Sequence, residues 1–221
     1  DVKMIYHDGT RFIATLTDKQ ENPIRDAAIE ITINGKTYTK TTDEKGVVSL
    51  GLSLDSGIYT VTVNFKGTAD YTPITKQAKV TIEPTVKGLD VVKMFRNDTQ
   101  YYAIFTDSQG NPLKNKDVQF NINGVFYTKT TNDKGIAMMG INLNPGKYVI
   151  TAINLVTGEQ SGNNITVKSL IVQNDLTKYY LNASRFQTTI YNKDGSLAVN
   201  KEVTFNINGV FYTKTTDKNG I

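Results

Sequence analysis

The chain has 221 residues, a mass of 24.5 kDa and a formal net charge of +4, with lysines and acidic residues interspersed rather than segregated. This balance argues against a nucleic-acid partner, and no apolar run of roughly eighteen residues predicts a membrane span. The chain lacks Cys and Trp, and the absence of Cys excludes a disulfide scaffold, a cysteine-based zinc site and a cysteine nucleophile. It has one histidine, His7, so any Ser–His–Asp enzyme would depend on that residue.

Thr and Asn are unusually frequent, with 30 and 21 copies. Thr favours the pleated surface of strands, whereas Asn favours tight turns and tolerates positive φ. A cysteine-free chain of Thr-rich strands and Asn/Gly turns suits an extracellular stalk better than an ordinary cytosolic β protein.

An internal repeat sets the organisation. The segment Phe120–Thr131 recurs letter for letter as Phe205–Thr216, and a drifted copy spans Ile31–Thr42. We therefore divide the chain into repeat 1 (residues 1–83), repeat 2 (84–168) and an incomplete repeat 3 (169–221).

Repeat 2 consists of short segments in which apolar and polar residues alternate, separated by residues that favour turns. The Asn123-Gly124 pair predicts a type I′ hairpin turn, and Gly140 indicates a bulge. No amphipathic helix of useful length is expected. The fold class is all-β: tandem immunoglobulin-like β-sandwiches of about seven strands per repeat. The expected strands are Val91–Phe95, Tyr101–Thr106, Val118–Ile122, Val125–Thr130, Ile136–Leu143, Tyr148–Ile153 and Ile165–Lys168.

Five segments of repeat 2 carry a resemblance to a known family: Gly110–Leu113, Asn123–Thr131, Lys134–Ala137, Ile141–Tyr148 and Asn164–Val167. In this series the chain resembles the tandem immunoglobulin-like repeats of the large adhesin-like surface proteins of gut methanogenic archaea. More distantly, it is similar to the stalk repeats of bacterial invasin and intimin. The resemblance covers repeat 2, the available part of repeat 3, and repeat 1 with drift. It implies a cell-surface, extracellular location and a spacer role that holds a binding tip away from the cell.

A Tyr-Thr-Lys-Thr-Thr stripe is the most repeated feature, with Tyr38, Tyr127 and Tyr212 in matching places. In the simpler interpretation one side of this strand packs in the sandwich, while Thr and Lys face water. In the alternative, Phe126 lies exposed beside Tyr101 or Tyr102 as an aromatic platform for a sugar.

Three Asn-x-Ser/Thr sequons, at Asn97, Asn164 and Asn182, are possible N-glycosylation acceptors on an exported chain. The turns 42–46, 131–135 and 216–220 place Asp or Asn near a Gly. Each has only one or two acids beside a Lys, too few oxygens for calcium, so Asx turns are expected and no metal or cofactor.

Lys93 could form an isopeptide cross-link with Asn164 (or Asn163) under catalysis by Asp107, as many surface-adhesin sandwiches do. This triad does not recur, because Asn192 stands in repeat 3 where Asp107 stands in repeat 2. An ordinary solvated lysine is therefore the simpler interpretation of Lys93.

The sequence favours a non-catalytic cell-surface adhesin stalk or filament segment. The alternatives are a carbohydrate- or cell-wall-binding module and an accessory domain of a secreted enzyme. The expected partners are neighbouring repeats joined end to end through a small, partly polar interface. A surface glycan or protein of another cell is a further candidate partner.

Repeat 3 is expected to be an open, four-stranded remnant. Ile221 matches Ile136, so counterparts of residues 137–168 are lacking in residues 169–221. Open strand edges and an uncovered inner face invite strand addition by other copies at residues 169–221.

Overall fold

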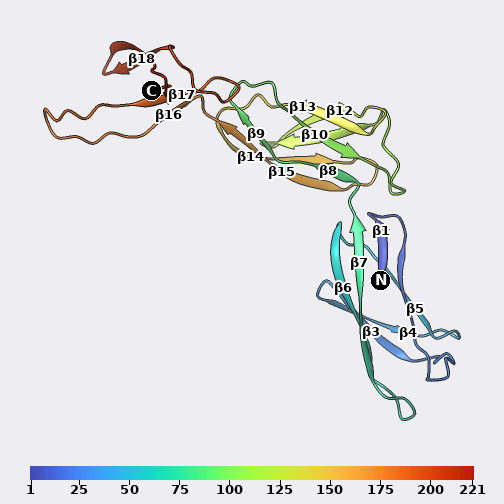
Figure 1. The fold of residues 1–221 in the computed structure, drawn as a ribbon. Helices are drawn as coiled ribbons and strands as arrows, with labels where there is room; N and C mark the ends of the chain where they lie inside the picture. Colours follow the sequence, from blue (N-terminus) through green and yellow to red (C-terminus); the bar gives the residue numbers. More distant parts are fainter.

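The computed structural model describes all residues 1–221, and every regular element in it is a β-strand, which confirms the predicted all-β class. No helix in the chain is long and apolar enough to span a membrane. Figure 1 shows the three repeats following one another along the chain, with the N-terminus in repeat 1 and the C-terminus in repeat 3.

Repeat 1 is a two-layer sandwich. One layer is a five-stranded sheet of order β1-β7-β6-β3-β4, in which β1 runs parallel to β7; the other is the pair β2-β5. Apolar side chains at alternate positions meet between the layers, and Ile31, Val61 and Val80 are fully buried there. The strands are β1 (Val2–Ile5), β2 (Arg11–Thr15), β3 (Ala28–Ile33), β4 (Lys36–Thr41), β5 (Val47–Gly51), β6 (Gly57–Phe65) and β7 (Ile74–Glu83).

Repeat 2 repeats this plan with one more strand. A five-stranded sheet, β12-β11-β14-β15-β9, faces a three-stranded sheet, β13-β10-β8. Its core is more aromatic, and Tyr101 meets Phe120 edge to face with ring centroids 5.3 Å apart. The strands are β8 (Val86–Gly88), β9 (Val91–Met94), β10 (Gln100–Phe105), β11 (Asp117–Ile122), β12 (Val125–Thr130), β13 (Ile136–Gly140), β14 (Gly146–Ile153) and β15 (Gln160–Lys168).

The structure corrects the strand assignment of repeat 2 in three places. The boundary segment contains strand β8, because the Val86 side chain is buried in the core. The last strand begins at Gln160, since β15 pairs with β14 along its whole length. The expected bulge at Gly140 is absent, because Gly140 pairs directly with Gln100 and the strand ends there.

The three Asn-Gly turns have the predicted type I′ backbone. The φ angles are 48° and 73° at Asn34 and Gly35, 54° and 77° at Asn123 and Gly124, and 48° and 83° in the third copy, Asn208-Gly209. Each turn therefore joins two neighbouring strands of one sheet, such as β11 and β12.

Residues 169–221 form two separate two-stranded sheets, β16-β17 and β18-β19. The number of strands is the expected four, but the first of them, β16, is the counterpart of β8 and not of the predicted first strand. Residues 174–187 contain no strand. In repeat 2 the corresponding strand is β9, which pairs with β15, and residues 169–221 hold no counterpart of β15. Both hydrophobic core clusters lie outside this segment. Its strands are β16 (Ile171–Gln173), β17 (Thr188–Ile190), β18 (Glu202–Ile207) and β19 (Val210–Thr215).

Candidate functional site

The contact between repeats 1 and 2 centres on a buried carboxylate, that of Glu159. Its Oε2 accepts hydrogen bonds from the Thr85 backbone N–H (2.5 Å) and the Thr85 hydroxyl (2.6 Å), and its Oε1 accepts one from the Ser56 hydroxyl (2.5 Å). Only 4% of Glu159 is exposed. One side chain of repeat 2 thus holds both the linker and a turn of repeat 1, and hydrogen bonds to a charged acceptor are the stronger kind.

Hydrogen bonds within two turns hold Glu159 and its partner Ser56 in position. The loop between β14 and β15 closes through Asn154, whose backbone carbonyl accepts from Gly158 and whose backbone N–H donates to the Glu159 carbonyl. Gly158 has a φ of +78°, which a residue with a side chain adopts at a cost. On the other side, the Tyr59 hydroxyl donates to the Asp55 carbonyl and fixes the turn that carries Ser56.

A second buried polar group, the Asn154 side chain, is hydrogen-bonded to the linker. It is fully buried, and its amide donates to the Thr106 carbonyl (2.8 Å) and to the Thr85 hydroxyl (3.2 Å). That hydroxyl also lies 2.8 Å from the Thr157 hydroxyl. The cluster is fully hydrogen-bonded, so the polar groups carry no uncompensated desolvation cost and fix one geometry. We call Ser56, Thr85, Asn154, Thr157 and Glu159 the Glu159 joint.

The rim of the Glu159 joint adds weaker contacts. Glu83 lies between Lys3 (3.6 Å) and Lys87 (3.8 Å), but both lysines are exposed and Glu83 is only half-buried, so these ion pairs contribute little. The Tyr6 ring stacks on His7 at 3.9 Å. Burial, together with the nearby carboxylates of Asp55 and Glu159, raises the pKa of Tyr6. The contact between the repeats is therefore polar in part, as expected.

The contact between repeats 2 and 3 uses the same packing but lacks the carboxylate. A Cβ on Gly195 would lie 3.8 Å from Met94, and a Cβ on the corresponding Gly110 would lie 3.1 Å from Ile5. Residues 169–221 hold no counterpart of Glu159, and Leu170 and Pro145 occupy the places of Thr85 and Ser56. One hydrogen bond crosses this contact, from the Asn97 side-chain amide to the Lys193 carbonyl (3.0 Å).

Lys93 is buried, so its interpretation as a solvated lysine is wrong. Its Nζ donates to the backbone carbonyls of Asn97, Thr99 (3.1 Å) and Ile141 (2.8 Å). Burial lowers the pKa of Lys93, an effect that Asp98 partly opposes. Because Met4 takes the same place in repeat 1, comparison of the two repeats position by position would have indicated an inward side chain.

The three members of the isopeptide hypothesis do not meet. The Asp107 carboxylate accepts from the backbone N–H groups of Gln109 (2.9 Å) and Asn111 (2.8 Å) in its own exposed turn. Asn164 donates to Asp90, from its backbone N–H at 2.8 Å and from its side chain at 3.1 Å. Lys93 is bonded to carbonyls alone, so the structure gives no support to a cross-link in repeat 2.

The sequon asparagines stand in different environments. Asn97 and Asn182 form equivalent turns, in which the side-chain oxygen accepts from the backbone N–H of Thr99 and of Ser184, both at 2.7 Å. The Asn97 amide faces repeat 3, whereas Asn182 is exposed. Asn164 is exposed on β15, with its amide on Asp90. Only Asn182 combines exposure with a side-chain amide that donates to no protein group.

The three Asp/Asn-Gly turns are closed by their own backbone. Asp43 Oδ1 accepts from the N–H groups of Lys45 (2.9 Å) and Val47 (2.8 Å), and Asn132 and Asp217 accept in the same pattern. These are the hydrogen bonds of Asx turns.

The aromatic stripe does not form the platform that the alternative interpretation requires. Tyr101 is buried and its hydroxyl donates to Asn163 Oδ1 (2.8 Å), while Tyr102 lies in the opposite sheet from Phe126. The packing interpretation is also wrong, because Phe126 and Tyr127, on opposite faces of β12, are both exposed. Strand β12 is the end strand of a five-stranded sheet that faces a sheet of only three strands, and its burial pattern shows no buried side chain.

The comparisons with known proteins are distant. No protein-family model matches the sequence, and no curated protein matches it. One similar solved structure is a Ca²⁺-stabilized adhesin that helps an Antarctic bacterium to bind ice; it is 19% identical with a TM-score of 0.28, and the match covers 99% of this chain and 61% of that one. A protein of the Bacteroides ovatus mixed-linkage glucan utilization locus, solved with a heptasaccharide, is 14% identical with a TM-score of 0.31 and coverages of 96% and 65%.

The bacterial integrin-binding protein invasin is also similar, at 15% identity and a TM-score of 0.33, with 92% of this chain and 47% of that chain covered. The chain spans less than two thirds of the length of each of these three structures. At such values the comparisons say nothing of what this chain binds.

Proposed function

We propose that this chain is a non-catalytic segment of an extracellular, cell-surface adhesin stalk, in which tandem immunoglobulin-like repeats act as spacers. The observation that carries the proposal is the Glu159 joint. A buried carboxylate that bonds Ser56 of repeat 1 and Thr85 of the linker fixes how one repeat follows the next. A spacer needs this property, because a stalk with free hinges would not hold its tip away from a surface.

Two further features favour a spacer over an enzyme or a sugar-binding module. The repeated residues are used for structure: the Asx turns bind their own backbone, and the buried Lys93 binds three carbonyls. The exposed aromatic residues Phe126 and Tyr127 point to opposite faces of one strand, so they offer a sugar no common surface. The archaeal origin rests on the sequence resemblance alone.

The shape of the full chain in solution tests the spacer role. Small-angle X-ray scattering should give one extended particle in which repeats 1 and 2 hold a fixed arrangement. The variant Glu159→Ala should widen the distribution of distances between them, while Asp43→Asn, in a turn away from the joint, should leave it unchanged. An unaltered profile for Glu159→Ala would remove the support for the proposal.

Location is tested separately. Proteolysis of intact cells of the source organism should release peptides from residues 1–168 before any cytosolic marker. Release only after lysis would contradict the surface role.

The proposed partners are the neighbouring repeats of the same protein and, for residues 169–221, other copies by strand addition. The open face of β18-β19 supports the second part: it borders a cavity of about 270 Å³ lined by Phe186, Val203 and Phe205. Concentration-dependent dimers in light scattering, abolished by Val203→Lys, would support strand addition. A monomer at all concentrations would contradict it.

A further inference from the structure

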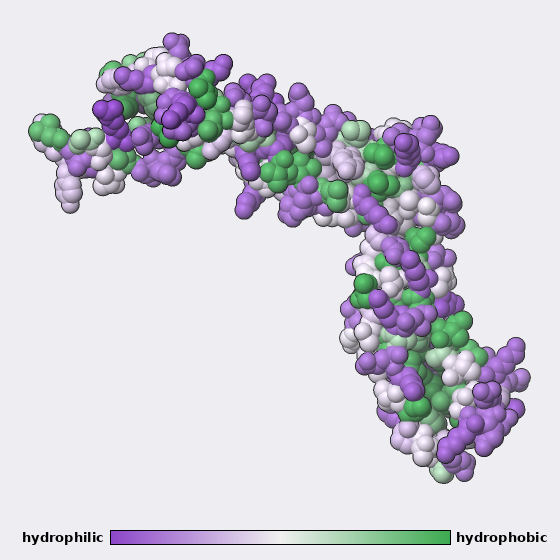
Figure 2. Space-filling model, in the orientation of Figure 1, coloured by the Kyte–Doolittle hydropathy of each residue, from purple (hydrophilic) through white to green (hydrophobic).

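Repeat 2 has an open pocket of about 230 Å³ where the end of β8, the start of β9 and the start of β10 meet. Its lining combines one aromatic ring, aliphatic side chains and one carboxylate, and includes Leu89, Asp90, Val92, Gln100 and Tyr102. Figure 2 shows the hydrophobic surface of repeat 2 as patches set among hydrophilic surface. We call this space the Asp90 pocket.

Three apolar side chains of the Asp90 pocket are exposed. Leu89 is 64% exposed, Val92 60% and Tyr102 43%. At the equivalent positions repeat 3 carries the polar residues Asn174, Thr177 and Gln187. The position of these side chains in the fold therefore does not require apolar residues, and an exposed apolar cluster of this kind indicates an interaction surface.

The carboxylate of the pocket is held in place and kept ionised. Asp90 Oδ1 accepts from the Asn164 backbone N–H (2.8 Å), and Oδ2 accepts from the Asn164 side-chain amide (3.1 Å). These hydrogen bonds lower the pKa of Asp90. Since a carboxylate oxygen has two lone pairs and one hydrogen bond reaches Oδ2, an acceptor position stays free.

Asp90 has no cationic partner within the chain, because none of the three ion pairs of the protein involves it. The basic residues that flank it in the sequence are engaged elsewhere. Lys87 lies 3.8 Å from Glu83, and Lys93 donates to backbone carbonyls. Arg96 lies over the ring of the preceding residue, 5.3 Å from its centroid.

The other repeats carry basic residues at two positions of this pocket. The place of Gln100 is taken by Arg11 in repeat 1 and by Arg185 in repeat 3, and the place of Val92 is taken by Lys3 in repeat 1. Repeat 2 alone has neutral side chains at both positions.

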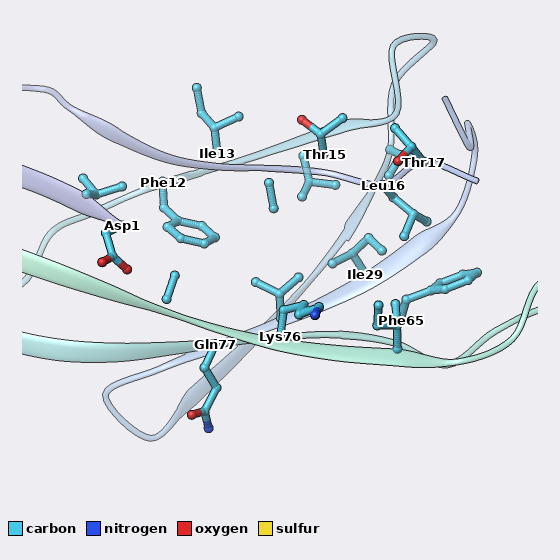
Figure 3. Close-up of a pocket in the computed structure, with 17 residues that line it drawn as sticks. Asp1, Phe12, Ile13, Thr15, Leu16, Thr17, Ile29, Phe65, Lys76 and Gln77 are labelled. Atoms are coloured by element: carbon cyan, nitrogen blue, oxygen red, sulfur yellow. The ribbon is translucent and has the colours of Figure 1, made fainter. Parts of the chain in front are cut away.

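The equivalent carboxylate in repeat 1 is that of Asp1, which accepts from the Lys79 backbone N–H (2.7 Å). Figure 3 shows Asp1 and Lys76 among the side chains that line a cavity of about 400 Å³ in that repeat. The carboxylate there shares its surroundings with a lysine of the same repeat, whereas no basic residue lines the Asp90 pocket.

We propose that the Asp90 pocket binds a basic side chain, a lysine or an arginine, that a protein partner presents next to an apolar residue. The charged end pairs with Asp90 Oδ2 and lies over the Tyr102 ring, and the aliphatic stem lies along Leu89 and Val92. The neighbouring apolar residue of the partner contacts Met138, which pairs with Tyr102 across the sheet and is exposed.

Charge and shape together select this occupant. An exposed ion pair is weak by itself, but apolar surface for the stem and an aromatic face for the cation add to it. An anionic group would be repelled by Asp90, and a purely apolar one would cover the carboxylate without pairing it. The inference does not depend on the stalk role.

Titration with two matched peptides tests the charge. The probes are acetyl-Leu-Arg-Leu-amide and the same peptide with citrulline, which keeps the shape of arginine without its charge, each added to the full chain labelled with ¹⁵N. We expect amide shifts at Leu89, Gln100 and Tyr102, and binding of the arginine peptide at least about fivefold tighter. Equal affinities, or no shift at these amides up to the solubility limit, would overturn the proposal. So would larger shifts at the same amides with the neutral sugar cellotetraose.

Substitutions copied from the other repeats test the location. Gln100→Arg supplies an internal cation and should abolish binding of the arginine peptide, and Tyr102→Gln should weaken it at least about threefold. Gln20→Arg adds the same charge in an exposed turn of repeat 1 and should leave binding unchanged. The Asp90 carboxyl should titrate at lower pH in Gln100→Arg than in the unaltered chain, as measured by ¹³C NMR. Undiminished binding to Gln100→Arg, or an unaltered titration of Asp90 in it, would refute the site.

Discussion

The Ser56 hydroxyl donates to the Glu159 carboxylate over 2.5 Å, although 103 positions separate the two residues in the sequence. This hydrogen bond joins repeat 1 to repeat 2, and the other carboxylate oxygen holds Thr85 of the linker. The direction in which repeat 2 follows repeat 1 therefore depends on one buried acid.

Two substitutions at the Glu159 joint should affect different properties: the free energy of unfolding of repeat 2, and the motion of repeat 1 relative to repeat 2. Glu159→Ala leaves Thr85 without its acceptor, so we expect the free energy of unfolding of repeat 2 to fall by about 1–3 kcal/mol. Ser56→Ala removes only the bond between repeats, so it should increase their relative motion and leave that free energy nearly unchanged. Denaturant unfolding and NMR relaxation of each repeat measure the two effects. Equal loss of stability in both variants would contradict this division.

Buried Lys93 should tolerate Met better than Ala. Met4 fills the matching place in repeat 1, so Lys93→Met keeps the volume and costs mainly the lost donor, which leaves three backbone carbonyls unpaired, about 1–3 kcal/mol. Lys93→Ala loses the same donor and also creates a cavity, so it should cost about 2 kcal/mol more than Lys93→Met. Chemical denaturation of the full chain compares the two variants, and an equal or smaller loss for Lys93→Ala would contradict the close packing of this side chain.

Tyr101 should make repeat 2 sensitive to alkali. Burial, with a smaller effect of Asp90, raises the pKa of Tyr101 to about 12. The neutral phenol is therefore favoured in the folded state, and its contribution is complete below the unfolded pKa of about 10. It is lost as pH rises from about 10 through 12. The variant Tyr101→Phe, which copies Phe12 of repeat 1, should flatten this part of the stability curve. Parallel curves for the two proteins would contradict the assignment.

The stability of the Asn123-Gly124 turn should depend on the positive φ angle of its glycine. Gly124 has a φ of +77° and open space around the position of a Cβ, so Gly124→Ala costs only the left-handed conformation, about 1–2 kcal/mol. Gly140→Ala is the matched control, since that site is equally open and Gly140 lacks a positive φ. Thermal unfolding of both variants tests the difference, and equal Tm values would rule out turn strain as the cause.

Glycan occupancy should follow the hydrogen bonds of the three sequons. The Asn97 and Asn164 amides donate to Lys193 and Asp90, whereas exposed Asn182 donates to no protein group. Expression in a glycosylating host should therefore modify Asn182 first, as measured by peptide mass spectrometry. The variant Lys193→Gly keeps the carbonyl acceptor and serves as a control for side-chain effects at Asn97. Preferential occupancy of Asn164 would contradict this order.

The sequence predicts the parts of this fold that depend on neighbouring residues. Asn123-Gly124 specifies its turn through local backbone preferences alone, and alternation of apolar residues identifies the strands. The burial of Lys93 could not be read from its own strand, because its three acceptors come from two separate loops. Glu159 was missed for the same reason: its partners lie 74 and 103 positions away. Strand β8 is three residues long, too short to show a period.

The parallel pairing of β1 with β7, and of β9 with β15, bears on how each repeat resists tension. In repeat 1, β1 pairs with β7 from Val2 and Val80 to Ile5 and Glu83, and β9 pairs with β15 in the same way. A pull applied before β1 and after β7 acts at opposite ends of two strands that point the same way. The hydrogen bonds between them are then loaded together, in shear, rather than opened one after another like a zipper. Each complete repeat therefore carries a mechanical clamp between its two points of attachment.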